Sequence, residues 1–343
     1  MSLPEVWFLL IAIFWGAYFL LEGFDFGVGI LLPFLGRDER DRQAMFDSIG
    51  PVWDGNEVWL VIAGAGTFAA FPVWYATAFS GFYLALLLVL VLLIIRVVSF
   101  EWWSKNDEPR WRTTWQWANT VGSVGAPLLW GVALANFLHG VPLDEQGDFA
   151  GDFLDLFSAY TVFAGLVVVL LFAFHGATFL TLRTSGDLCE RAATAARRLA
   201  VPAAFGAGAF LAWTVAVAVD RNDKDVFPPV LPAALGGLAL VLAVVFVFGR
   251  RSGWAFVMTA LGTVLLVATI FTSLYPRVLV SNPEFANSLT ISNASSSHYS
   301  LKVMTIAALI IAPIVLLYQA WTYHVLRERV GGGVPTAEGP PAG

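Results

Sequence analysis

Long apolar runs without formal charge constrain this sequence more than any other feature. From Val58 to Ile95 there is no Asp, Glu, Lys or Arg. Of the 343 residues, 58% are hydrophobic and 13% are charged, whereas a soluble domain has roughly a quarter of its residues charged. A surface so poor in charge would aggregate in water, so lipid must surround most of it. The sequence therefore predicts an all-α integral membrane protein.

The apolar runs indicate nine transmembrane helices. A span needs about 20 apolar residues, so the run from Val58 to Ile95 is too long for one helix. We expect it to break at Phe71-Pro72, because proline disrupts a helix. The predicted spans are 5–32, 56–73, 77–96, 115–138, 156–182, 199–219, 229–248, 253–275 and 301–325.

The positions of Lys and Arg predict an orientation. With nine spans the connecting loops alternate between the two sides of the membrane. All but four of the 19 basic residues then lie on one side, the four being Arg221, Lys224, Arg277 and Lys302. Basic residues favour the cytoplasmic side. We therefore expect the N-terminus outside and the C-terminus inside.

Two carboxyl groups lie within the first predicted span. Glu22 and Asp25 are three residues apart and share a helical face. Gly23 and Gly27 form a small-xxx-small pair, which lets another helix approach closely. An ionisable group in a span costs about 2.5–3.5 kcal/mol, so it marks a candidate functional site. Burial favours the neutral form of a carboxyl group, which suits a proton carrier. A structural carboxylate bonded to backbone or Arg fits the spacing equally well.

A second acidic cluster opens the second predicted span, in the run Asp54-Gly55-Asn56-Glu57. Asp54 could be an N-cap, with Glu57 completing an acidic variant of the capping box. Alternatively the cluster takes up protons, because it lies at the same predicted depth as Asp25. Arg96 ends the third predicted span and is expected to snorkel to the membrane surface.

The histidines and the single cysteine predict no cofactor bound by this chain. His175 lies well inside a span, whereas His139, His298 and His324 fall near span ends. A bis-His haem needs two facing ligands, so a hydrogen-bonded core histidine is the favoured interpretation of His175. Cys189 alone excludes an internal disulfide or a Cys-based zinc site. No phosphate-binding loop, dinucleotide motif or basic stripe for nucleic acid is present. The chain shows no metal site and no catalytic centre of its own.

The run from Glu22 to Gly29 resembles the first-helix signature of cytochrome bd quinol oxidase subunit II. The resemblance is collinear from about residue 15 to 325. Its other matches are Trp53-Asp54-Gly55-Asn56, Val58-Trp59, Ala78 to Tyr83, Gly131-Val132-Ala133, Asn136, Asn287 to Thr290, Ala294-Ser295-Ser296 and Leu301 to Thr305.

This resemblance implies two four-helix bundles, residues 1–140 and 156–276, followed by a ninth transmembrane helix at 300–326. Residues 330–343 would form a flexible cytoplasmic tail. The family's partner, subunit I, carries two b-type haems, haem d and the quinol-oxidising loop. Together the subunits oxidise quinol and reduce dioxygen to water in the bacterial plasma membrane, taking protons from the cytoplasm. Subunit II of the family binds no haem. The resemblance does not decide whether this subunit holds a structural quinone or a lipid, or whether the complex has a small accessory subunit.

The resemblance also implies a proton path through Asp25 and Asp54, with Glu22 as a helper. The sequence departs from the family pattern at three positions. Glu22 stands where Asp is expected, Glu57 where a neutral amide is expected, and Asn293 where Asp is expected. The first change moves the carboxyl group about one methylene outward, and the second adds an acid at the mouth of the path.

Two other functions compete with this interpretation. Buried carboxyl groups would also serve a proton-coupled secondary transporter, which should show broken helices near the midplane in both halves. Only the segment Glu22–Gly29 looks interrupted in this way. The other alternative is a scaffold whose carboxylates only hold the helices together.

Overall fold

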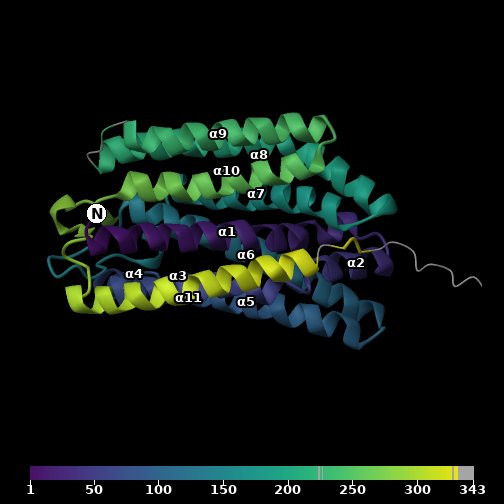
Figure 1. Cartoon of the computed structure of the whole chain (residues 1–343), viewed down its shortest axis with the longest axis horizontal. Helices are drawn as coiled ribbons and strands as arrows, with labels where there is room; N and C mark the ends of the chain where they lie inside the picture. The colour runs from purple at the N-terminus through teal and green to yellow at the C-terminus, as the bar shows by residue number, and fades with distance from the viewer. Residues whose placement is uncertain (223–224, 226, 327, 331–343) are drawn as a thin grey trace, which may run out of the picture.

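The computed structural model describes residues 1–222, 225, 227–326 and 328–330. Apart from Val330, the predicted tail at 330–343 lies outside the described residues. The long helices lie side by side along the long axis of the molecule (Figure 1). They are α1 (Leu3–Leu35), α3 (Trp53–Ala70), α5 (Tyr83–Trp102), α6 (Pro109–His139), α7 (Ala159–Arg183), α8 (Gly186–Arg221), α9 (Phe227–Phe248), α10 (Ser252–Leu274) and α11 (His298–Val325).

Short elements connect the long helices. The helices α2 (Glu39–Ile49) and α4 (Pro72–Gly81) flank α3 along the chain. Single 3-10 turns are η1 (Trp103–Lys105), η2 (Phe153–Leu156) and η3 (Phe285–Asn287). The strands β1 (Arg277–Leu279) and β2 (Leu289–Thr290) pair antiparallel in the loop before α11.

Eight helices of the described residues are long and apolar enough to cross a membrane. The remaining long helix, α3, has 18 residues, and polar side chains occupy its first turn. The predicted break at Phe71-Pro72 is confirmed, because α3 ends at Ala70 and α4 starts at Pro72. A second break, which the sequence analysis missed, occurs at Phe82. It follows Gly81, whose absent side chain leaves room for the Phe149 ring.

Glycine contacts place α1 at the centre of the molecule, against α3, α6, α7 and α10. A β-carbon on Gly27 would lie 2.7 Å from the Cα of Gly176 in α7. One on Gly131 in α6 would lie 2.6 Å from the Cα of Gly165 in α7. The close approach predicted from Gly23 and Gly27 is therefore confirmed, since Gly27 lies against the backbone of α7 and Gly23 against the ring of Phe172 in the same helix.

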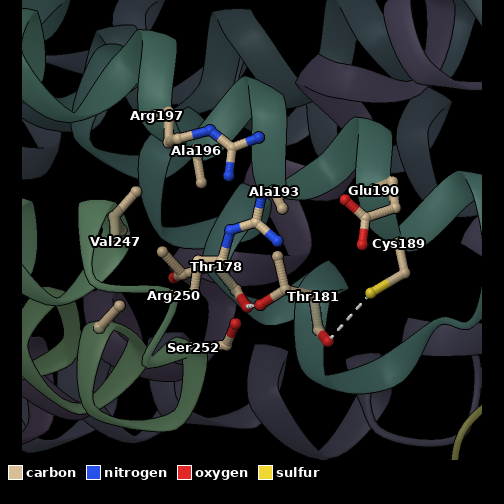
Figure 2. Close-up of a pocket in the computed structure, with 11 residues that line it drawn as sticks. Thr178, Thr181, Cys189, Glu190, Ala193, Ala196, Arg197, Val247, Arg250 and Ser252 are labelled. Carbon is tan, nitrogen blue, oxygen red and sulfur yellow. Dashed lines mark hydrogen bonds between the residues drawn. The ribbon is translucent and has the colours of Figure 1, made fainter.

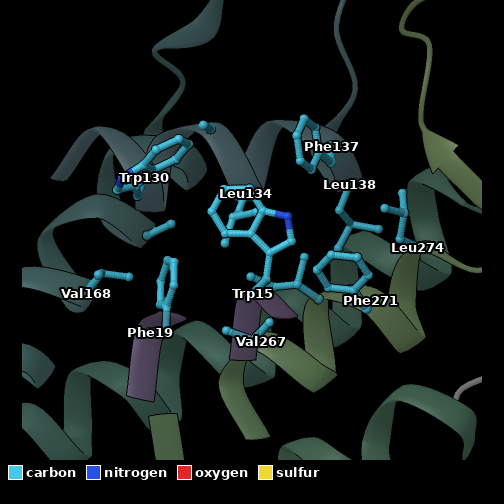
Figure 3. Packing of buried hydrophobic residues seen from close by; sticks show 14 of the residues in the cluster. Trp15, Phe19, Trp130, Leu134, Phe137, Leu138, Val168, Val267, Phe271 and Leu274 are labelled. Carbon is cyan, nitrogen blue, oxygen red and sulfur yellow. The ribbon is translucent and has the colours of Figure 1, made fainter. Parts of the chain in front are cut away.

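Aromatic and aliphatic side chains from four helices fill the space around α1 (Figure 3). The rings of Trp15 in α1 and Trp130 in α6 meet edge to face, with centroids 5.0 Å apart. The packed cluster includes Trp15, Phe19, Trp130, Leu134, Phe137, Leu138, Val168, Val267, Phe271 and Leu274.

Polar contacts, more than burial, hold α11 against the other helices. All of its residues are described, and Leu301 is the one that is buried. Trp7 donates to the Thr305 hydroxyl at 3.0 Å, and Trp59 donates to Gln319 at 2.8 Å. The rest of α11 leaves its apolar side chains exposed, as expected for a helix that faces lipid or another membrane protein.

Candidate functional site

A fully buried arginine joins three helices. Arg96 in α5 is 0% exposed and donates to Oε1 of Glu22 in α1. It lies 3.4 Å from Oε2 of Glu57 in α3. Its guanidinium group sits over the rings of Phe26 and Phe100, with the carbon 4.4 and 5.3 Å from the two centroids. Cation–π contacts of this kind stabilise a desolvated guanidinium.

The prediction that Arg96 snorkels was therefore wrong. The side chain turns inward because two carboxyl groups and two aromatic rings face it, and because α5 continues beyond it to Trp102. Glu22 and Glu57 lie at the same predicted membrane depth as Arg96, and this shared depth could have indicated the ion pairs.

Asp25 lies in the same cluster and is also 0% exposed. Its Oδ2 accepts a hydrogen bond from the Asn56 amide at 2.8 Å. The Asn56 carbonyl oxygen accepts in turn from the Tyr323 hydroxyl at 2.7 Å, and Gln319 lies at 3.4 Å. These contacts orient the Asn56 amide so that its NH2 group faces Asp25. Sequence analysis had assigned no role to Asn56 or to these α11 residues.

Several atoms of the cluster have spare bonding capacity. Oδ1 of Asp25 and Oε2 of Glu22 accept no hydrogen bond from the N–H or hydroxyl donors of the described residues. Nε and Nη2 of Arg96 likewise find no acceptor there. Buried polar atoms are nearly always paired, with protein or with ordered water. These four atoms are therefore positions at which ordered water can bind.

Asp54 and Glu57 lie closer to the surface. Asp54 is exposed in the first turn of α3, and the Glu57 side chain is 19% exposed. The N-cap of α3 is Val52, without a side-chain hydrogen bond, so the interpretation of Asp54 as an N-cap was wrong. The helix simply starts earlier than predicted. The structure brings Glu22 and Glu57 to Arg96 and Asp25 to Asn56 in the same cluster, and leaves Asp54 one turn outside.

The charges of this cluster do not balance. Glu22 and Glu57 pair with the guanidinium of Arg96, and Asp25 is a third buried carboxyl group nearby, bonded to Asn56, so the cluster holds three carboxyl groups and one guanidinium among the described residues. An uncompensated buried charge costs several kcal/mol, and uptake of protons relieves this cost. The arrangement is therefore suited to binding and releasing protons. No group of three or more His, Cys, Asp or Glu in the described part of the chain could hold a metal ion.

His175 occupies a second buried polar site, between α1, α7 and α10. Its Nδ1 lies 2.7 Å from the Thr259 hydroxyl, and its Nε2 lies 3.2 Å from the Leu20 carbonyl oxygen. The ring stacks on Phe256 with centroids 4.7 Å apart. Because both nitrogens are bonded within the protein, the prediction of a hydrogen-bonded core histidine is confirmed.

The interruption expected at Glu22–Gly29 is absent, because α1 is one continuous helix from Leu3 to Leu35. Its glycines serve helix contacts and do not break the backbone pattern. A broken helix at a midplane binding site is typical of many secondary transporters. The one segment that looked like a broken transporter helix is therefore a regular helix.

An apolar cavity of about 640 Å³ lies between α1, α3, α4, α5 and α6. Aromatic side chains form much of its lining. The indole N–H of Trp74 is buried beside it without an acceptor among the described residues. Other lining residues are Trp15, Phe68, Phe79, Phe82 and Trp130.

The fold and the site together define a class: a multi-pass helical membrane protein with a buried cluster of carboxyl groups and one arginine among α1, α3 and α5. The family model described as Cytochrome bd terminal oxidase subunit II matches residues 3–326. The chain belongs to this family, as the resemblance at Glu22 to Gly29 predicted.

Individual relatives agree with this assignment. The chain is 41% identical to cytochrome bd ubiquinol oxidase subunit 2 of Bacillus subtilis (strain 168), over 97% of this chain and 98% of the relative. It is 36% identical to cytochrome bd-I ubiquinol oxidase subunit 2 of Escherichia coli (strain K12), over 95% and 94%. Its fold is similar to a chain of the bd oxidase from Geobacillus thermodenitrificans, with a TM-score of 0.73, 21% identity, and coverage of 95% and 98%.

Proposed function

We propose that this chain is the haem-free subunit II of a cytochrome bd-type quinol oxidase in a bacterial plasma membrane. Its partner, subunit I, would hold two b-type haems and haem d, which supply the electron transfer and the oxygen chemistry. The complex oxidises quinol and reduces dioxygen to water. This chain stabilises subunit I and conducts protons. The supporting observation is the buried acidic cluster around Arg96 in a member of this family.

The proton path follows the gradient of burial. Asp54 collects protons at the surface, and Glu57, with 19% exposure, stands one turn further in. From there the fully buried Glu22 and Asp25 carry protons into the helical core. Arg96 stays charged throughout, because its guanidinium does not release its proton in proteins. Its role is to keep the neighbouring carboxyl groups ionisable at a depth where burial alone would hold them neutral.

The same proposal includes the membrane arrangement. With α3 counted as a span, there are nine, and they form one bundle in residues 1–140, a second in 156–276, and a ninth helix at 300–326. The end of α1, the start of α3 and the end of α5 then lie on the basic, cytoplasmic side, where protons are taken up. A reporter fused after Arg329 should signal cytoplasm, and one inserted at 141–152 should signal the outside. Reversed signals at both positions would contradict the orientation.

The apolar cavity fits the structural quinone that the family resemblance left open. Its aromatic walls match a quinone ring and an isoprenoid chain. The buried Trp74 indole is a donor that could bind a quinone carbonyl oxygen. Extraction of the purified complex should release quinone from the wild type and less from Trp74→Phe, which keeps the ring size but removes the donor.

Optical spectra test the central proposal. The complex purified through a tag on this chain should show b-type and d-type haem absorbance and oxidise quinol with oxygen uptake. The chain expressed without subunit I should show no haem absorbance, because His175 already bonds within the protein through both nitrogens. Stoichiometric b-type absorbance from the isolated chain, lost in His175→Ala, would contradict the haem-free assignment.

A further inference from the structure

Two arginines converge on a small pocket at the end of the molecule where α9 turns into α10. The pocket has a volume of about 170 Å³ and lies between α7, α8 and the start of α10. Arg197 from α8 and Arg250 from the α9–α10 turn both point into it (Figure 2). Thr178, Thr181 and Ser252 add hydroxyl groups to its walls.

No carboxylate neutralises these two arginines within the described residues. Neither takes part in an ion pair there, although the exposed Glu190 also lines the pocket. Arg197 makes one side-chain hydrogen bond, to the Thr194 hydroxyl at 3.1 Å. Two guanidinium groups directed into one pocket repel each other unless an anion lies between them.

Arg250, whose side chain points into the pocket, has a strained backbone conformation. Its φ is 55°, in the left-handed region. The Arg250 N–H donates to Val247 and the Arg251 N–H donates to Phe246, which together form the Schellman motif that ends α9. Glycine usually occupies this position because a β-carbon is disfavoured there. The chain instead keeps an arginine, whose side chain is thereby aimed at α8.

The start of α10 adds to the preference for an anion. Ser252 is the first residue of α10 and lines the pocket, and the N-cap residue Arg251 makes no side-chain cap. The N–H groups of this first turn carry the positive end of the helix dipole. These N–H groups add to the positive charge of the two arginines, which supply most of the attraction for an anion.

The surroundings indicate that the anion is part of a lipid. Phe248 at the end of α9 and Trp254 at the start of α10 are large and exposed beside the pocket. Exposed apolar side chains continue along α8 and α9, for example Phe205 and Val245. Basic pockets between transmembrane helices bind anionic lipid headgroups, with the acyl chains on the apolar surface. We propose that this pocket binds the phosphate group of an anionic phospholipid.

Thermal unfolding of the purified complex in a neutral detergent tests the proposal. Dioleoylphosphatidylglycerol should raise the unfolding temperature, and dioleoylphosphatidylcholine at the same concentration should not. Arg197→Gln and Arg250→Gly should each weaken the apparent affinity for phosphatidylglycerol about tenfold, because each removes one charge-assisted contact. Arg251→Gln loses the same charge next to the pocket, outside its lining, and should respond like the wild type.

Arg250→Gly separates lipid binding from folding. Glycine suits the left-handed position, so without lipid this variant should be at least as stable as the wild type. A rise in unfolding temperature with inorganic phosphate alone, lost in the same two variants, would support the anion pocket and assign it to free phosphate. Equal responses of all variants to phosphatidylglycerol, or equal responses of the wild type to both lipids, would overturn the proposal. None of these outcomes depends on the oxidase activity.

Discussion

Two buried polar sites flank the contact between α1 and α7, and they differ in how completely their atoms are paired. At His175 both ring nitrogens are bonded and the ring is stacked on Phe256. In the acidic cluster, by contrast, atoms of Asp25, Glu22 and Arg96 lack partners among the described residues. A fully paired polar group stabilises one packing arrangement. A cluster whose buried polar atoms are only partly paired is the kind of site that the proposed proton path requires.

The same glycine contact supports both sites. Gly176 follows His175 directly, and its partner Gly27 lies two residues after Asp25. The two sites therefore share one helix contact and differ in their polar side chains. If the acidic cluster is functional and the His175 site is structural, substitutions in the acidic cluster should impair assembly or turnover, whereas substitutions at the His175 site should affect stability alone.

The largest effect is expected from Arg96→Gln. Removing the cation leaves Glu22 buried without its partner, and breaking a buried ion pair costs about 3–5 kcal/mol. We expect little assembled complex, measured as haem d per milligram of membrane protein. The double variant Arg96→Gln with Glu22→Gln removes both charges and should recover much of the assembly. Normal haem d in the single variant would show that the ion pair contributes little.

A smaller effect, on rate instead of assembly, is expected from Asp25→Asn. Asn has nearly the same shape as Asp but carries no proton. The variant should assemble with full haem content, while quinol-dependent oxygen uptake per haem d should fall more than tenfold, which equals about 1.4 kcal/mol of barrier. Asp25→Glu should keep a substantial part of the rate.

The scaffold alternative predicts the reverse result for the same variant. Poor haem recovery with a normal rate per remaining haem d would indicate that Asp25 only holds the helices together. Normal rates per haem d in both Asp25→Asn and Asp54→Asn would end the proton-path proposal.

Thr259→Val is the corresponding test of the paired site. It leaves Nδ1 of His175 buried without its partner, which costs about 1–3 kcal/mol. The unfolding temperature of the complex should fall, while oxygen uptake per haem d should not change. A reduced rate would mean that His175 belongs to the functional site as well.

The sequence predicted those parts of the site that lie on one helix. The spacing of Glu22 and Asp25, and of Gly23 and Gly27, predicted a shared carboxyl face and a close helix contact, and α1 has both. The ion pair of Arg96 and the hydrogen bonds of Asn56 were missed, because they join helices that are far apart in the chain. No local spacing encodes such a pairing. The pocket shared by Arg250 and Arg197 was missed for the same reason, since nothing in the sequence places α8 opposite the α9–α10 turn.

The smallest expected effect tests whether α11 contributes to the acidic cluster. Tyr323 donates to the carbonyl oxygen of Asn56 at 2.7 Å, and this bond keeps the Asn56 NH2 group directed at Asp25. Tyr323→Phe removes the donor and leaves only the longer contact from Gln319 at 3.4 Å. A neutral hydrogen bond contributes about 1 kcal/mol, so we expect roughly a fivefold lower oxygen uptake per haem d.

Tyr318→Phe is the matched control for this prediction. In the wild type, Tyr318 is an exposed residue of the same helix, and its hydroxyl makes no hydrogen bond among the described residues. It should therefore turn over oxygen like the wild type. If the acidic cluster conducts protons, Asn56→Ala should remove the effect of Tyr323→Phe, because the tyrosine acts through the amide. Additive losses in the double variant would mean that Tyr323 acts on the path by another route, and equal rates in both tyrosine variants would exclude α11 from the site.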